Sequence, residues 1–257
     1  MLLAVAVSLL LQPSFVDLTR NSSIIFTGRL EKTGASTPSV PATNDTAVVR
    51  VDDVLSQPRQ IVSLKGHEVT VRFRNGQPPP AGRPMLFFTT LYTAGETVGL
   101  DAVGVLAVPA GQAAEELAKA RQTILDEDTA ARLARSEFAV AGVVRSIKVL
   151  TVPDERRVSE HDPEWAEAQL AVRGVIKGQP ANRELVTVYF ASSRSALYAH
   201  WAKLREGDSV VVIAQREDPR LKIAFDRSPI RPPGPFVVDR NDVQPAERFE
   251  RVRGLTR

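Results

Sequence analysis

Apolar and polar residues alternate along several short segments of this chain, a pattern typical of strands that bury one face. Segments 69–73 and 186–190 both show it, each beginning Val-Thr-Val and ending in Phe. Segments 85–88 and 210–213 are instead continuous apolar runs, which favour strands covered on both faces. The pattern therefore predicts a chain that is mainly β.

Four of these strand segments occur twice, in the same order along the chain. The offset between the copies changes by only a few residues from one segment to the next, as insertions in connecting loops produce. The pattern predicts a tandem duplication of one small β domain. The paired segments are 22–30 with 136–144, 47–55 with 168–176, 69–73 with 186–190, and 82–88 with 207–213.

Each copy is predicted to form a five-stranded barrel. Gly28 and Gly142 lie inside the long first strands, where an internal glycine often marks a bulge that lets a strand curl. In the second copy, residues 193–204 begin with an N-cap serine and carry an apolar stripe, which predicts a helix. Residues 221–225 are predicted to form the fifth strand. Three strands, a helix and two strands is the order of an OB-type barrel.

The expected domain boundaries follow from this repeat. Helical periodicity predicts one helix over residues 112–124, a second short helix over 126–135, and a short helix at 15–20 behind Ser14. The charged segment 244–254 is predicted to be a frayed helix. The predicted parts are a signal-peptide-like segment (1–13), a first OB-like domain (14–111), a helical linker (112–126), and a second OB-like domain with a C-terminal tail (127–257).

The first residues favour export. Residues 2–11 form an apolar run that is too short to span a bilayer as a helix but suits the centre of a signal peptide. No Lys or Arg precedes the run and no clear cleavage site follows it, so a buried first strand or helix is the alternative. We expect a periplasmic or secreted protein without a transmembrane helix.

Four motifs of the first copy carry a resemblance to a known family. They are Ile-Ile-Phe-Thr-Gly-Arg-Leu at 24–30, Val-Arg-Val-Asp-Asp-Val-Leu at 49–55, Val-Thr-Val-Arg-Phe at 69–73 and Gly-Arg-Pro-Met-Leu-Phe-Phe at 82–88. Their order resembles bacterial netrin-module domains, which share an OB-type barrel with tissue inhibitors of metalloproteinases. The resemblance implies an exported, non-enzymatic, protein-binding barrel. The inhibitors chelate a protease zinc through an N-terminal cysteine, and this chain has no cysteine. Inhibition by that route is therefore not expected.

Charge and composition remove several classes of function. The 257 residues carry a net charge of +3, with nine basic and eight acidic residues in 1–111 and 22 and 20 in 126–257. Neither half has the concentrated positive charge on which nucleic-acid binding relies, so no nucleic-acid partner is expected. The lack of cysteine excludes disulfides, thiolate metal sites and a cysteine nucleophile.

The densest polar cluster, residues 160–165, supplies the candidate ligand-binding residues His161, Asp162, Glu164 and Trp165. A histidine near carboxylates can hold a metal or act as a base, but Asp-Pro also favours a turn and Trp165 can anchor a strand. We predict no catalytic residue, no metal and no cofactor. Residues 151–163 join the first two strands of their copy, a connection that OB-type barrels use for ligands; a passive linker is the alternative.

These observations favour an exported, non-enzymatic binding or adaptor protein whose partner is another envelope or extracellular protein. Two alternatives stay open. One is a binder of single-stranded nucleic acid that would stack bases on Phe73 and Tyr189. The other is an enzyme that would use the cluster from Glu160 to Glu164.

Overall fold

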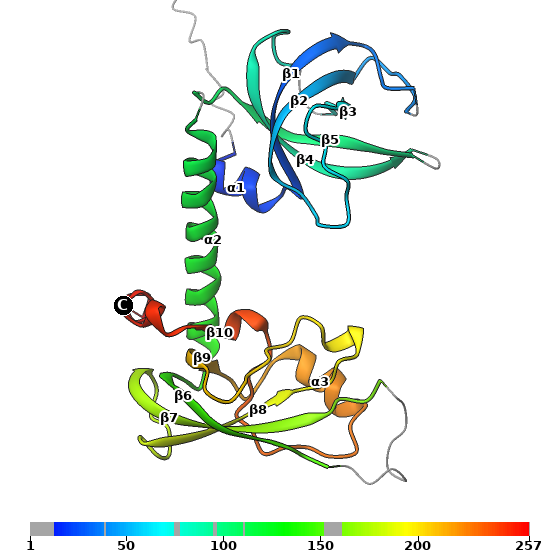
Figure 1. The fold of residues 1–257 in the computed structure, drawn as a ribbon. Coiled ribbons are helices and arrows are strands. Elements are labelled where there is room, and N and C mark those ends of the chain that lie inside the picture. The colour runs from blue at the N-terminus through cyan, green and yellow to red at the C-terminus, as the bar shows by residue number, and fades with distance from the viewer. Residues whose placement is uncertain are drawn as a thin grey trace, which may run out of the picture. The chain divides into compact units, whose positions relative to one another are not determined.

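A computed structural model describes residues 13–38, 40–74, 78–94, 97–109, 111–151 and 161–256. The chain divides into two compact units, residues 1–124 and 125–257, and is mainly β, as predicted (Figure 1). The apolar run at 2–11 and Glu160 lie outside the described residues, so export stays a prediction.

The first unit is a closed five-stranded barrel, as predicted. Its strands close in the order β1-β2-β3-β5-β4; β3 and β5 run parallel and the other neighbours are antiparallel. The interior is apolar, with the rings of Phe26 and Phe87 stacked at 5.1 Å. The strands are β1 (Ile24–Thr33), β2 (Thr46–Ser56), β3 (Glu68–Arg72), β4 (Pro84–Ala94) and β5 (Thr97–Leu106).

Two helices precede the first strands of the two units. Helix α1 (Phe15–Arg20) begins at a capping box in which Ser14 Oγ accepts a hydrogen bond from the Asp17 N–H at 3.1 Å. Helix α2 (Ala113–Arg135) is one continuous helix, so the prediction of two separate helices around residue 125 is wrong. Residues 124–127 read Ile-Leu-Asp-Glu and contain no proline or glycine that would end a helix.

The second unit contains a five-stranded sheet of order β10-β9-β6-β7-β8. This sheet is open, so the predicted second barrel is not present as a continuous ladder. Phe236 makes isolated bridges to Tyr189 of β8, in parallel, and to Gln215 after β9, in antiparallel. The strands are β6 (Phe138–Val149), β7 (Trp165–Lys177), β8 (Leu185–Ala191), β9 (Ser209–Ala214) and β10 (Val243–Pro245).

Gly28 and Gly142 both sit at bulges, as predicted. The β1–β2 register shifts between Thr27 and Gly28, and the β6–β7 register shifts between Ala141 and Gly142. A Cβ on Gly28 would lie 2.6 Å from the carbonyl oxygen of Arg50, and one on Gly142 would lie 2.5 Å from that of Ala171. Each strand therefore bends where only a glycine lets the neighbouring backbone approach.

Residues 221–225 are not a strand, which corrects the sequence prediction. They belong to helix α3 (Pro219–Asp226), which begins at Asp218 as N-cap with Pro219 in the first turn. Leu221 and Ala224 are buried and lie three positions apart, which is the spacing of a helix face rather than of a strand. The start signal and the helical spacing outweigh the apolar run.

The predicted helix at 193–204 is also wrong. Only the 3₁₀ turn η2 (Ala196–Tyr198) forms there. The following residues run extended, because the Ala202 N–H donates to the Val238 carbonyl at 3.1 Å and the Arg240 N–H donates to the His200 carbonyl at 3.0 Å. Trp201 and Ala202 are both buried, and pairing with residues 238–240 lets these two adjacent side chains be covered.

The C-terminal segment is packed rather than frayed. After the 3₁₀ turn η3 (Arg240–Asp242), the chain forms β10, the 3₁₀ turn η4 (Ala246–Arg248) and helix α4 (Phe249–Gly254). Val252 of α4 is fully buried against the core of the second unit. No helix among the described residues has the length and apolar character needed to cross a membrane.

Candidate functional site

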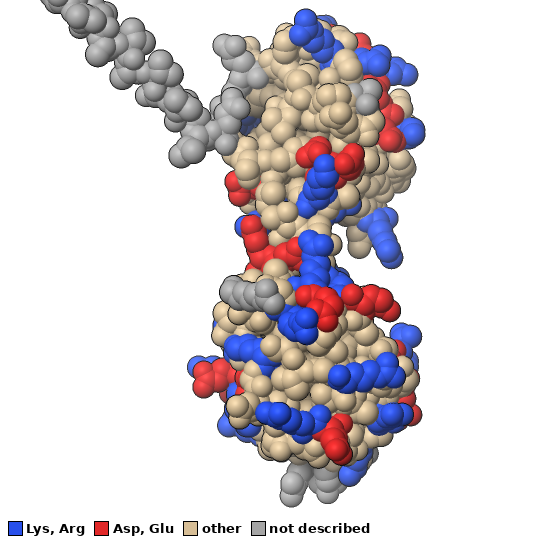
Figure 2. All heavy atoms as spheres, turned by 90° about the vertical axis from the view of Figure 1, so that its left-hand side faces the viewer, with Lys and Arg blue, Asp and Glu red and all other residues tan. Residues whose placement is uncertain are grey.

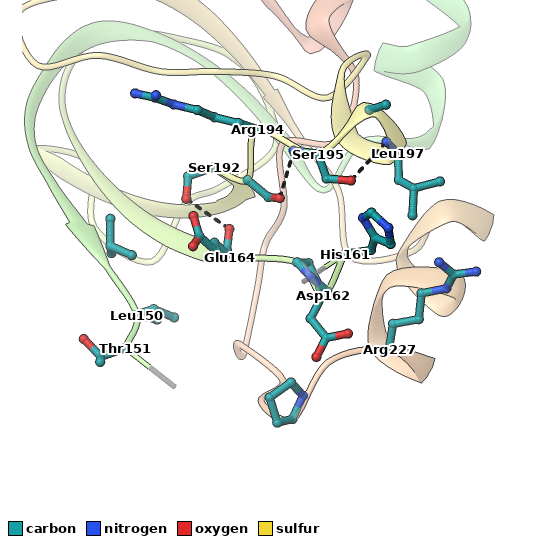
Figure 3. A pocket seen from close by; sticks show the side chains of 15 residues that line it. Leu150, Thr151, His161, Asp162, Glu164, Ser192, Arg194, Ser195, Leu197 and Arg227 are labelled. Carbon is teal, nitrogen blue, oxygen red and sulfur yellow. Dashed lines mark hydrogen bonds between the residues drawn. The ribbon is translucent and has the colours of Figure 1, made fainter. Parts of the chain in front are cut away.

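A cavity of about 880 Å³ opens in the second unit where several inter-strand connections meet (Figure 3). Its wall is formed by the end of β6 (149–151), the residues that lead into β7 (161–164), the β8–β9 connection (192–197), and Arg227 and Pro229 after α3. Drug-sized and peptide ligands bind in cavities of this size. The cavity is therefore the candidate ligand site.

Three of the four predicted site residues line this cavity, namely His161, Asp162 and Glu164. Trp165 does not line it, because its side chain is fully buried and its Nε1–H donates to Ser228 Oγ at 2.9 Å. The prediction that Trp165 could anchor the strand describes its place better than a ligand role does. Trp165 opens β7 and holds the segment after α3.

Short hydrogen bonds fix the shape of the β8–β9 connection beside these residues. The Ser192 N–H and the Ser192 hydroxyl both donate to the Glu164 carbonyl, at 2.7 and 3.1 Å. Further on, the Leu197 N–H donates to Ser195 Oγ at 3.4 Å (Figure 3). The two Ser192 bonds join the start of the 192–197 connection to the residue before β7, and the Ser195 bond shapes the connection itself.

Sequence reasoning missed three residues of the cavity wall. Leu197 has 53% of its side chain exposed, whereas its spacing in the sequence predicts a buried helix face. Arg194 and Arg227 are exposed, and neither guanidinium forms an ion pair with a carboxylate of the described residues. No pattern in the sequence joins these three residues to the 160–165 cluster, because they come from other connections of the second unit.

An aromatic cluster surrounds Trp165, which follows Glu164 of the cavity wall. The Trp165 ring lies 5.9 Å from that of Trp201, 5.5 Å from Phe225 and 5.6 Å from Phe236, centroid to centroid. Burial raises the pKa of the neighbouring Tyr198 hydroxyl above its ordinary value, so Tyr198 stays neutral. Ring contacts of this kind stabilise the packing around Trp165.

An ionic network holds α3 in place behind the cavity. Arg220 binds Asp218 with two hydrogen bonds of 2.9 Å, from Nε and Nη2, and donates from Nη1 to Asp239 at 2.7 Å. Arg132 of α2 donates to Asp242 at 3.1 Å. The carboxylates of this network are largely buried, so each depends on its arginine.

This network predicts that the second unit loses stability in acid. Burial raises the pKa values of Asp218 and Asp239, but hydrogen bonds from Arg220 and from the backbone outweigh it and hold both below the ordinary value. The contribution of Asp218 and Asp239 to the free energy of unfolding is therefore complete above about pH 4, the ordinary Asp pKa. It is lost as the pH falls through their lowered pKa values in the folded protein. We expect the urea midpoint to fall between pH 6 and pH 3.

The Arg220→Met variant is the control for this pH effect. Without Arg220, Asp218 and Asp239 lose the side-chain hydrogen bonds that lower their pKa values, while the backbone hydrogen bonds and, for Asp239, the pairing with Arg132 remain. Acidification should therefore lower the midpoint less than in the wild type. Burial raises the pKa of Asp242, whose protonation acts in the opposite direction in both proteins. An equal fall in the two proteins would show that the network does not cause it.

Three observations on the described residues bear on metal binding and on the nucleic-acid alternative. No three His, Asp or Glu side chains among them come together as a metal site. Phe73 and Tyr189, the proposed stacking residues, are only 6% and 8% exposed and present no free ring face to a base. On the face drawn in Figure 2, basic and acidic side chains are interspersed within each unit.

No protein-family model matches the chain, and no curated protein matches it in sequence.

Proposed function

We propose that this chain is an exported, non-enzymatic binding protein, and that its second unit holds part of a partner protein in the 880 Å³ cavity. The observation that carries the proposal is the position of this cavity, which is lined mainly by inter-strand connections at the end of β6 rather than by the face of the sheet. Binding sites lie preferentially on such connections, since the strands behind them are rigid.

We also propose that both units are OB-type, netrin-like barrels that arose by duplication. In the first unit, Asp101 of β5 is paired with Arg72 of β3 and with Thr90 of β4. Phe236 has the same relation to Tyr189 and Gln215. These residues are related by the offsets of the repeated segments, which supports an equivalent fifth strand in the second unit.

The 3₁₀ turn η3 explains why that strand is broken. It lies between Phe236 and β10, and β10 pairs with β9 as the end of β5 pairs with β4. Two residues of the ionic network belong to this turn: Asp239 is its N-cap, and Asp242 is its last residue. The segment that interrupts the strand is therefore also the one that binds α3, and through it positions Arg227.

A photo-crosslinking amino acid tests the function directly. p-Benzoylphenylalanine in place of Leu197, which lines the cavity, should form an adduct with a protein partner when cells that express the chain are irradiated. The same amino acid in place of Val175 of β7 is the matched control, because Val175 is 38% exposed and lies outside the cavity wall. Adducts at neither position, or the same adducts at both, would refute a partner site in the cavity.

A further inference from the structure

A second, smaller pocket adjoins the large cavity and shares two of its wall residues. It encloses about 290 Å³, and Leu197 and Arg227 line both spaces. This volume is at the lower end of the range of about 300–1,000 Å³ in which protein pockets bind ligands. The small pocket can therefore accept one large side chain, whereas the cavity beside it has room for several residues.

The walls of the small pocket are mainly apolar. Tyr198, Trp201 and Ala224 are buried side chains that line it, and Ile223 at its rim is 60% exposed. Together with Leu197, Ile223 places two large exposed aliphatic groups at one opening. Apolar anchors of a partner bind where such a pocket excludes water.

The charged side chains in the wall of the small pocket are basic. Its titratable wall residues besides Tyr198 are His200, Arg220 and Arg227, and no carboxylate of the described residues lines it. Arg220 is already bound to Asp218 and Asp239. Arg227 makes no ion pair with any described carboxylate, so its guanidinium is available to an anionic group of a ligand.

We propose that this site binds the C-terminus of a partner protein. The last side chain is large and apolar and fills the small pocket, and the terminal carboxylate pairs with Arg227. The preceding residues run into the large cavity along the 192–197 connection, where Ser192 and Ser195 present hydroxyl groups. This inference rests on the proposed function and specifies which part of the partner binds.

A free carboxylic acid with an apolar group has the same chemistry, but it would leave the large cavity empty. The size of that cavity, about three times the volume of the small pocket, is the reason to assign a chain terminus. A competition arm with N-acetylphenylalanine separates these two ligands. Half-displacement of bound peptide by a concentration near the peptide's own Kd would show that a small acid suffices, and would overturn the assignment.

Immobilised peptide libraries provide the main test. Random pentapeptides ending in Leu, Phe or Trp are presented with a free C-terminal carboxylate or with a C-terminal amide, and binding of the full chain is measured. We expect at least tenfold tighter binding to the acids than to the amides. Equal binding to the two forms, or no binding to the acids at 1 mM peptide, would overturn the inference.

Two variants test whether Arg227 causes the preference for a free carboxylate over an amide. Arg227→Gln should reduce acid binding about tenfold, to the amide level, and leave amide binding unchanged. Arg231→Gln is the matched control, because Arg231 is an exposed arginine four positions further along that lines neither space. An unchanged acid preference in Arg227→Gln would refute the role of Arg227.

The position of the crosslink in the partner tests this inference separately from the proposed function. Mass spectrometry of the Leu197 adduct should place the attachment in the last few residues of the partner. An adduct at an internal segment would leave the cavity as a partner site and refute the terminus. Absence of any adduct would refute the proposed function itself.

Discussion

Replacement of Gly142 by alanine is expected to destabilise the second unit by about 3 kcal/mol, near the upper end of the cost of overpacking. The new Cβ would lie 2.5 Å from the Ala171 carbonyl oxygen and 3.2 Å from the carbonyl carbon, both of which are backbone atoms that no rotamer change can move. Urea unfolding gives the loss. Hydrogen exchange should place it in β6 and β7 rather than in the first unit.

Two further glycines make this result specific. Gly28→Ala should cause a similar loss in β1 and β2, since its Cβ would lie 2.6 Å from the Arg50 carbonyl oxygen. Gly254→Ala, at the end of α4, has no atom within 4 Å of its Cβ and should change stability by less than about 0.5 kcal/mol. If Gly142→Ala lowered the free energy of unfolding no more than Gly254→Ala, the close backbone approach at the Gly142 bulge would be refuted.

Replacement of Arg220 by methionine should cost about 3 kcal/mol, because it removes the cation that pairs with buried Asp218 and one of the two arginines, Arg220 and Arg132, that pair with Asp239. The Asp218 and Asp239 side chains are only 7% and 17% exposed. Helix α3 is held through these contacts, so the loss should be accompanied by faster hydrogen exchange in residues 219–226. Urea unfolding at pH 7 measures the change in free energy.

Arg216→Met is the matched control for this variant. Arg216 precedes α3 and pairs with Glu137, but the two side chains are 59% and 35% exposed. Exposed pairs of this kind contribute at most about 1 kcal/mol. An Arg220→Met protein no less stable than Arg216→Met would show that the network behind the cavity is not what holds α3.

The strands could be predicted from the sequence because their hydrophobic pattern is local and occurs twice. Val69 and Val71 alternate with polar residues, and the repeated segments corroborate each other. Gly28 and Gly142 could be placed at bends because a glycine inside an apolar strand commonly marks a bulge or a close backbone approach. These strands and the OB-type pattern predicted the closed barrel of the first unit, whereas its strand order comes from the structure.

The error at 193–204 arose where a tertiary contact overrides the local pattern. Leu197, Trp201 and Leu204 have helical spacing, yet the segment is extended because its backbone pairs with residues 238–240, more than 30 positions away. The sequence of residues 193–204 itself gives no sign of a pairing with such a distant segment. The strand predicted at 221–225 is instead helix α3, whose local start signal was overlooked. Under the proposed repeat, the equivalent of the fifth strand is the segment of Phe236, which is indicated by its bridges to Tyr189 and Gln215.

The candidate site was predicted only in part. His161, Asp162 and Glu164 were found because polar residues cluster there in sequence, and all three line the cavity. Arg194, Leu197 and Arg227 come from other connections and meet this cluster only in the folded unit. Their types are common on protein surfaces, so no pattern in the sequence could have joined them.

The most direct measurement of the binding function is crosslinking from the cavity wall in intact cells. With the photo-reactive residue at Leu197, we expect one protein partner to be captured, and we expect the yield to fall in an Arg227→Gln background. At Val175 we expect no adduct. Capture of the same proteins at both positions, or at neither, would contradict a partner site in this cavity.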